Sequence, residues 1–199
     1  QRGRVRLLLD ILLPPRCALC PSAEEPVCGP CLARLPYLTR PACARCGRPT
    51  AMPVADCREC SGRRLAFRSA GAAVVYEGGG RELVRHLKSG RRRALALPAG
   101  AVVAALLHAD GCEAVCWVPG DWWRTVRRGC HPAELVAREA ARRWGLPAVD
   151  LLEPARLRRP QRGLDPAARR RNVRGAFRVR RAATVPTAVA LVDDVYTTG

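Results

Sequence analysis

Two stretches decide the fold of the first part of this chain: CALCPSAEEPVCGPC (residues 17–31) and CARCGRPTAMPVADCREC (residues 43–60). Together they hold four CxxC pairs. A CxxC turn directs two thiolates at one point about 2.3 Å away, and two such turns complete a tetrahedral Cys₄ zinc site. Redox-active pairs or disulfides are the alternative, but this dense spacing favours two structural Zn²⁺ sites. Their expected ligands are Cys17, Cys20, Cys28, Cys31, Cys43, Cys46, Cys57 and Cys60.

The sequence leaves the pairing of the four knuckles open. Sequential ribbons, in which neighbouring knuckles share a zinc ion, need only short loops, while a cross-braced arrangement joins alternate knuckles. In both cases a closed Cys₄ site has no open coordination position, so the zinc ions are expected to stabilise the fold and not to catalyse a reaction. Residues 14–62 are too short to bury a core without them. We expect a double zinc-ribbon module over residues 1–64, beginning with a short amphipathic helix.

Beyond residue 64 the pattern changes to strands alternating with helices. Pro132 in the first turn and Gly145 after the last turn delimit the best-marked helix. The alternation indicates an α/β domain over residues 65–199, with a mostly parallel sheet, flanking helices and ligands at the carboxyl ends of its strands. Strands are predicted at residues 69–77, 113–119, 148–152, 176–179 and 187–193, and helices at residues 82–88, 96–109 and 132–144.

The chain ends on LVDDVYTTG (residues 191–199), in which two carboxylates leave the carboxyl end of a buried-type strand. The following turn suits a phosphate, because backbone N–H groups and Thr hydroxyls can surround it. Carboxylates fit poorly against a phosphate and well against sugar hydroxyls. The stretch therefore predicts a ribose 5-phosphate site, and an acidic strand-to-turn junction without a ligand is the alternative. Asp193 and Asp194 would contact the ribose, and the phosphate would lie within Val195, Tyr196, Thr197, Thr198 and Gly199.

VALVDDVYTTG (residues 189–199) resembles the phosphoribosyl-pyrophosphate (PRPP) loop of type I phosphoribosyltransferases. The whole arrangement resembles the ComF family, in which a zinc module precedes a phosphoribosyltransferase-like domain and which is associated with competence and DNA uptake. YEGGGRELVRHLKSG (residues 76–90) and RRPQRGLDPAARRRNVRGAF (residues 158–177) are similar to further family segments. The resemblance implies a type I phosphoribosyltransferase-like fold. It also implies a glycosyltransferase reaction that moves phosphoribose from PRPP, bound with Mg²⁺, to an acceptor.

The resemblance also assigns roles to individual residues. Lys88 ends the matching helix, and the pyrophosphate loop begins at Pro119 and Gly120. Residues 154–174 form a basic lid that closes over PRPP, stabilises departing pyrophosphate and excludes water. WVPGDWW (residues 117–123) and RRGCHPAEL (residues 127–135) depart from the family's Val-Pro-Val-Pro and Arg-Gly-Phe-Asn-Gln segments. The catalytic set implied by the resemblance is Asp193, Asp194, Gln161, Arg169 and Asn172.

Charge supports a second function class. The chain carries 35 Lys and Arg residues against 17 Asp and Glu residues, a formal net charge of +18. This balance fits an anionic partner, although the arginine bias of a GC-rich genome also explains it. The alternative function is a single-stranded-DNA-binding accessory protein of natural transformation, with DNA-uptake proteins as partners and a non-catalytic PRPP-sensing domain. Trp122 and Trp123 are its candidate stacking platforms.

No run approaches the roughly 18 uninterrupted apolar residues of a membrane helix, and we expect a cytoplasmic protein without a membrane span. The missing initiator methionine and the end within a turn predict a fragment of a longer chain. Outside the CxxC pairs, Cys112 and Cys116 are expected to be small buried hydrophobic residues. A nucleophile formed by Cys130 and His131 is disfavoured, because adjacent side chains rarely face each other.

Overall fold

The computed structural model describes most of the chain. The side chains of residues 166, 167, 169 and 170 lie outside this description, as does the helix expected within residues 1–15. The described residues are 16–22, 25–38, 41–89, 93–120, 125–126, 129–156, 165–181 and 183–196.

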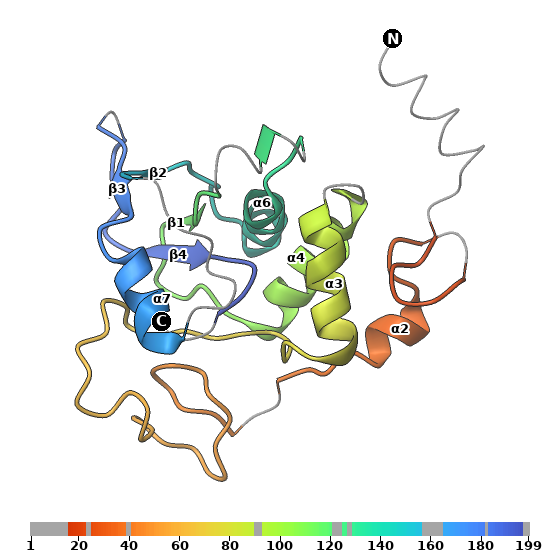
Figure 1. The fold of residues 1–199 in the computed structure, drawn as a ribbon, viewed down its shortest axis with the longest axis horizontal. Coiled ribbons are helices and arrows are strands. Elements are labelled where there is room, and N and C mark those ends of the chain that lie inside the picture. The colour runs from red at the N-terminus through yellow and green to blue at the C-terminus, as the bar shows by residue number, and fades with distance from the viewer. Residues whose placement is uncertain are drawn as a thin grey trace.

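Short helices and strands follow one another along the described chain (Figure 1). Within its described residues, the zinc-ribbon part contributes one helix of a single turn and otherwise consists of loops with isolated β-bridges. The later elements carry the α/β content that the sequence predicts. In chain order the elements are α2 (Gly29–Ala33), α3 (Gly78–Ser89), the 3₁₀ helix η1 (Arg93–Leu95), α4 (Ala96–Leu106), β1 (Ala114–Trp117), α6 (Pro132–Trp144), β2 (Leu152–Pro154), α7 (Pro166–Val173), β3 (Phe177–Val179) and β4 (Val189–Val192).

A small parallel sheet lies at the centre of the α/β part. Strand β1 pairs with β4 in parallel, with Ala114 opposite Val189 and Trp117 opposite Val192. On its other side β1 forms a parallel bridge from Val115 to Ala148. The expected strand at residues 148–152 is therefore divided, because its start joins this sheet and its end begins β2. Strand β2 pairs with β3 in a separate antiparallel sheet.

Residues 69–77 do not form the predicted strand of the parallel sheet. In the described structure they pair with the segment that joins the two ribbons, through an antiparallel bridge between Tyr37 and Val74. The N–H of Val75 donates to the carbonyl of Pro36 at 2.8 Å. The chain then enters α3 at once, and a Cβ on Gly80 would lie 2.3 Å from the Val75 carbonyl. Among the described residues, this segment thus pairs with residues 36–38 and not with β1 or β4.

Helix α6 begins and ends where the sequence predicts. His131 is its N-cap and its Nδ1 accepts from the Glu134 N–H at 3.1 Å, while Gly145 ends it at a φ of 68°. The apolar helix α4 packs against α6. Among the described residues, no helix is both long enough and apolar enough to cross a membrane.

The main core joins elements from both parts of the chain. Val27 and Leu35 of the first ribbon are buried in the same cluster as Leu83 and Leu87 of α3. Val115 of β1 is fully buried in this cluster, which also contains Val136 and Ala137 of α6. The first ribbon is therefore packed into the α/β core, and in Figure 1 it lies beside α3.

Helix α7 lies inside the segment that the sequence analysis treats as a lid loop. Asp165 Oδ1 accepts from the Ala168 N–H at 2.8 Å, which caps the start of the helix, and Pro166 occupies its first position. Arg156 donates to the carbonyls of Asn172 and Arg174, both at 2.9 Å, and so satisfies groups at the helix end. The Asp165-Pro166 pair is a helix-start signal that was readable in the sequence.

Candidate functional site

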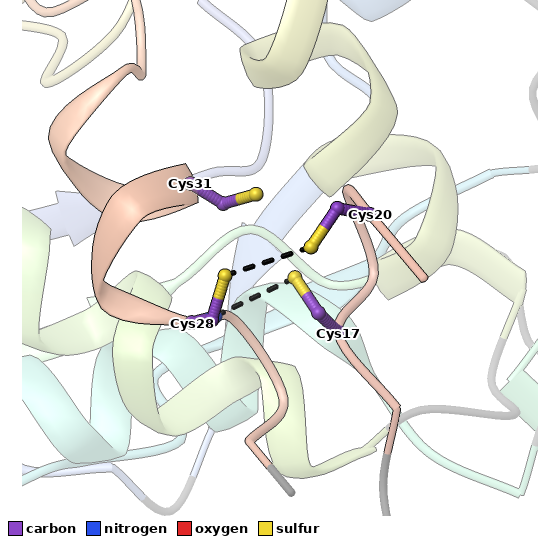
Figure 2. Close-up of side chains that lie close together, drawn as sticks. All are labelled: Cys17, Cys20, Cys28 and Cys31. Atoms are coloured by element: carbon purple, nitrogen blue, oxygen red, sulfur yellow. Dashed lines mark hydrogen bonds between the residues drawn. The ribbon is translucent and has the colours of Figure 1, made fainter. Parts of the chain in front are cut away.

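The first four cysteines converge on one point (Figure 2). Cys17 and Cys20 come from a loop, and Cys28 and Cys31 come from the start and the body of α2. Their four Sγ atoms lie within 4.8 Å of one another, and those of Cys20 and Cys28 are 3.6 Å apart. A tetrahedral zinc ion with bonds of about 2.3 Å requires sulfur separations of about 3.8 Å. The arrangement fits a Cys₄ zinc site.

The second group of four cysteines has the same geometry. Its Sγ atoms also lie within 4.8 Å of one another, with 3.5 Å between Cys46 and Cys57 and 3.6 Å between Cys43 and Cys60. All eight cysteines are free of disulfide bonds. The structure therefore decides between the two pairings that the sequence left open: neighbouring knuckles share a site, as in sequential ribbons.

The acidity of the thiols also fits a metal. Burial opposes ionisation of Cys17, but the backbone N–H groups of Cys28, Leu19 and Cys20 outweigh it and lower the pKa of Cys17 to about 6. Interaction with Cys20 above all raises the pKa of Cys31 to about 12. One thiolate thus forms readily and hinders the ionisation of the next. A divalent cation removes this repulsion, so four thiolates in one site require an ion such as Zn²⁺.

The carboxyl ends of β1 and β4 lie side by side, because the parallel register brings Trp117 next to Val192. The Val118 N–H continues the ladder to the Val192 carbonyl at 3.0 Å. The residues that follow each strand therefore leave the sheet at one place. We call this group the carboxyl edge and define it as Pro119, Gly120, Asp193 and Asp194.

Lys88 reaches the carboxyl edge from the last turn of α3. Its Nζ lies 3.0 Å from Asp194 Oδ1. The Asp193 carboxylate turns back onto the chain, where its Oδ1 accepts from the Asp194 N–H at 2.8 Å. The structure thus brings together Lys88 and the acidic pair, which the sequence had marked in separate segments.

His131 supports the other half of the carboxyl edge. Its Nε2 contacts the backbone nitrogen of Gly120, and its Nδ1 caps α6. A Cβ on Gly120 would lie 2.6 Å from His131 Nε2, so only glycine fits there without a shift. From the sequence, His131 is considered only as a partner of Cys130 in a disfavoured nucleophile. Its position before Pro132, with Glu134 three residues on, was the readable sign of a capping role.

Tyr196 lies against the segment that follows the second ribbon. Its ring meets Phe67 edge to face, with 6.4 Å between the ring centroids. Burial is the main cause that raises the pKa of Tyr196, and the charge of Cys46 in the second ribbon adds to it. The turn after β4, residues 193–196, is therefore close to the second Cys₄ site.

Most of the remaining predicted site residues lie within α7 or outside the described residues. Gln161 and residues 197–199 lie outside the described residues, as do Trp122 and Trp123. Arg169 and Asn172 fall within α7, where the side chain of Arg169 is not described. Val195 lies within the turn after β4.

The cysteines outside the CxxC pairs have different surroundings. Cys116 is buried on β1, and this burial raises the pKa of its thiol to about 11. That result confirms the prediction of a small buried hydrophobic residue. Cys112 and Cys130 are half-buried.

Comparison with known proteins bears on the cysteine-rich part. No curated protein and no solved structure matches the chain. Residues 8–61 match the family model of the Double zinc ribbon domain. This range contains all eight cysteines of the two sites, and it ends before the α/β part begins. The first part of the chain is a double zinc ribbon with two Cys₄ sites.

Proposed function

We propose that the carboxyl edge binds PRPP with Mg²⁺ and that the α/β part is a type I phosphoribosyltransferase-like domain of the kind found with zinc ribbons in the ComF family. In this proposal the protein works in DNA uptake and transfers phosphoribose to an acceptor base. The acceptor supplies the nucleophile, so the protein needs none of its own. Mg²⁺ is held chiefly by the PRPP oxygens and water.

One observation carries the proposal: the acidic pair, the only lysine of the chain and the segment at residues 119–120 meet at the carboxyl ends of two parallel strands. Ligands of open α/β sheets bind at this edge. Ionised carboxylates accept hydrogen bonds from ribose hydroxyls, and a lysine ammonium binds phosphate oxygens. The edge therefore offers groups of both signs to a sugar phosphate.

Calorimetric titration of Mg-PRPP into the zinc-loaded protein tests the proposal. We expect micromolar binding that the double variant Asp193→Asn/Asp194→Asn weakens about tenfold or more, because hydrogen bonds to charged groups contribute about 1.5–3 kcal/mol each. Asp110→Asn, an exposed aspartate before β1, is the matched control and should bind as the wild type does.

Pyrophosphate is the ligand control for the same titration. It lacks ribose, so the double variant should lose affinity for PRPP and keep its affinity for pyrophosphate. Equal binding of PRPP by wild type and double variant would contradict the assignment of the acidic pair to the ribose.

A second candidate, single-stranded-DNA binding, is favoured by the surface of the second ribbon and of the residues that directly follow it. Residues 41–68 contain six arginines and two acidic residues, and both acids pair with arginines, Arg45 with Asp56 and Arg48 with Glu59. Arg58, Arg64 and Arg68 are exposed beside them. A labelled single strand titrated at two salt concentrations tests this candidate, because phosphate contacts make affinity fall steeply with salt.

A further inference from the structure

The second ribbon depends on its metal site for a core. Its buried cluster consists of its four cysteines, with only Val54 and Leu65 packed against them. Four thiols with two aliphatic side chains bury too little apolar surface to hold a fold without a metal ion. The order of this ribbon and of whatever rests on it therefore follows the occupancy of the site.

The segment at residues 65–71 rests on the second ribbon. Leu65 packs on the cysteine cluster, and the Ala70 N–H donates to the Arg45 carbonyl at 2.8 Å. Gly47 lies so close to this segment that a Cβ on it would be 2.5 Å from the Ala70 carbonyl oxygen. The φ of 68° at Gly47 also favours glycine at this position. These contacts from both sides of the CxxC turn hold residues 65–71 against the metal site.

Phe67 projects from this segment onto the turn after β4. Its edge-to-face contact with Tyr196 falls two residues beyond Asp194, whose carboxylate is paired with Lys88 of α3. The turn that carries the acidic pair thus contacts α3 at Asp194. It contacts residues 65–71, which rest on the second ribbon, at Tyr196. The chain of contacts runs from the sulfur cluster through Leu65 and Phe67 to Tyr196.

We propose that the second zinc ribbon positions the carboxyl edge through Phe67 and Tyr196, which act as positioning residues. Zinc binding at the second Cys₄ site and order in residues 193–196 are then thermodynamically linked. A ligand of the carboxyl edge binds more tightly when this site holds zinc, and this last part rests on the proposed function. The positioning itself holds whatever the ligand is.

Hydrogen exchange of the ligand-free, zinc-loaded protein, followed by mass spectrometry, tests the positioning. In Phe67→Leu we expect the peptide that carries residues 193–196 to exchange about two- to tenfold faster, which is the effect of losing one edge-to-face pair. The zinc content and the exchange of residues 114–117 should stay unchanged. Tyr76→Leu, which removes an exposed aromatic ring on the approach to α3, is the matched control and should leave residues 193–196 as in the wild type.

A second variant removes the metal rather than the contact. Cys46→Ser/Cys57→Ser should release one zinc ion and accelerate exchange at residues 193–196 at least as much as Phe67→Leu does. Wild-type exchange at residues 193–196 in both variants would overturn the positioning, whether or not PRPP binds. If the exchange rises but PRPP fails to bind the wild type, the positioning stands and the proposed ligand is wrong.

Discussion

Gly100 lies where helix α4 closely approaches helix α6. A Cβ there would lie 2.6 Å from the Cβ of Glu139 and 3.0 Å from the Val136 carbonyl. The residue is buried within α4, a helix that otherwise consists of alanine, proline and larger apolar residues. A glycine in this position lowers the intrinsic stability of the helix and permits the packing of its neighbour.

Gly100→Ala should therefore destabilise the protein although alanine favours helix by about 1 kcal/mol. Overpacking at a rigid contact costs about 1–3 kcal/mol, so we expect a net loss of about 1 kcal/mol in the free energy of unfolding. Denaturant titration measures it. Ala105→Gly, at an exposed position of the same helix, gives the propensity effect alone. A more stable Gly100→Ala protein would show that the two helices can move apart freely.

Helix α6 is held by charges as well as by its caps. Glu139 is 7% exposed, and its carboxylate accepts from Arg142 at 2.9 Å and from Arg143 at 2.7 Å. The hydrogen bond from Arg142 is the largest influence on Glu139, and together with Arg143 it lowers the pKa of that carboxyl to about 2. The helix thus contains a buried, ionised carboxylate, whose charge Arg142 and Arg143 in the next turn neutralise.

The depressed pKa of Glu139 predicts a pH dependence of stability. The carboxyl titrates near 4.5 in the unfolded chain and about 2 in the folded one, so its contribution is complete above pH 4.5 and is lost as the pH falls toward 2. The difference in free energy of unfolding between wild type and Glu139→Gln should narrow over this window. The comparison cancels the acid-induced loss of zinc that both proteins share. A difference that stays constant from pH 7 to pH 3 would contradict the assignment. Glu82→Gln in α3, which removes an exposed i,i+3 ion pair with Arg85, is the control for losing such a pair at an exposed site.

The molecule as a whole has a core that crosses from the first ribbon into the α/β part. Val27 and Leu35 lie in one buried cluster with Leu83 and Leu87, and the segment after the first ribbon pairs with residues 73–75. The first ribbon should therefore stabilise α3 as well as itself. The domain boundary predicted after residue 64 remains a prediction. The shared core contains residues from both sides of that boundary.

Loss of zinc from the first ribbon should lower the melting temperature of the α/β part. All four tryptophans lie between residues 117 and 144, so tryptophan fluorescence reports on that part alone. In Cys20→Ser/Cys31→Ser we expect the fluorescence transition to shift down by several degrees, about 2–4 °C for each kcal/mol lost in a chain of this size. An unchanged transition with one zinc ion fewer would mean that the ribbons are an independent module, as the boundary after residue 64 predicts.

The cysteine spacing and the helix signals determined much of this protein without any tertiary information. Two residues between cysteines direct both thiolates to one ion, and the caps of α6 are satisfied within a single turn. Such local rules require no distant partner, and both predictions are confirmed. Helix α7 follows the same rule, because Asp165 caps its start and is a local capping signal in the sequence.

Only the tertiary structure decided which segments, distant in the sequence, are in contact. The partner of residues 73–75, the contact of Lys88 with Asp194 and the approach of Tyr196 to the second ribbon each join segments that are distant in the sequence. Forming such contacts costs loop-closure entropy, and the packing of the whole chain offsets this cost. A local sequence pattern therefore does not predict them. The sequence by itself therefore determined the two metal sites, and the ribose-phosphate chemistry of the acidic turn stays a prediction. Only the fold brings the turn after β4 into contact with Lys88 and close to the second ribbon.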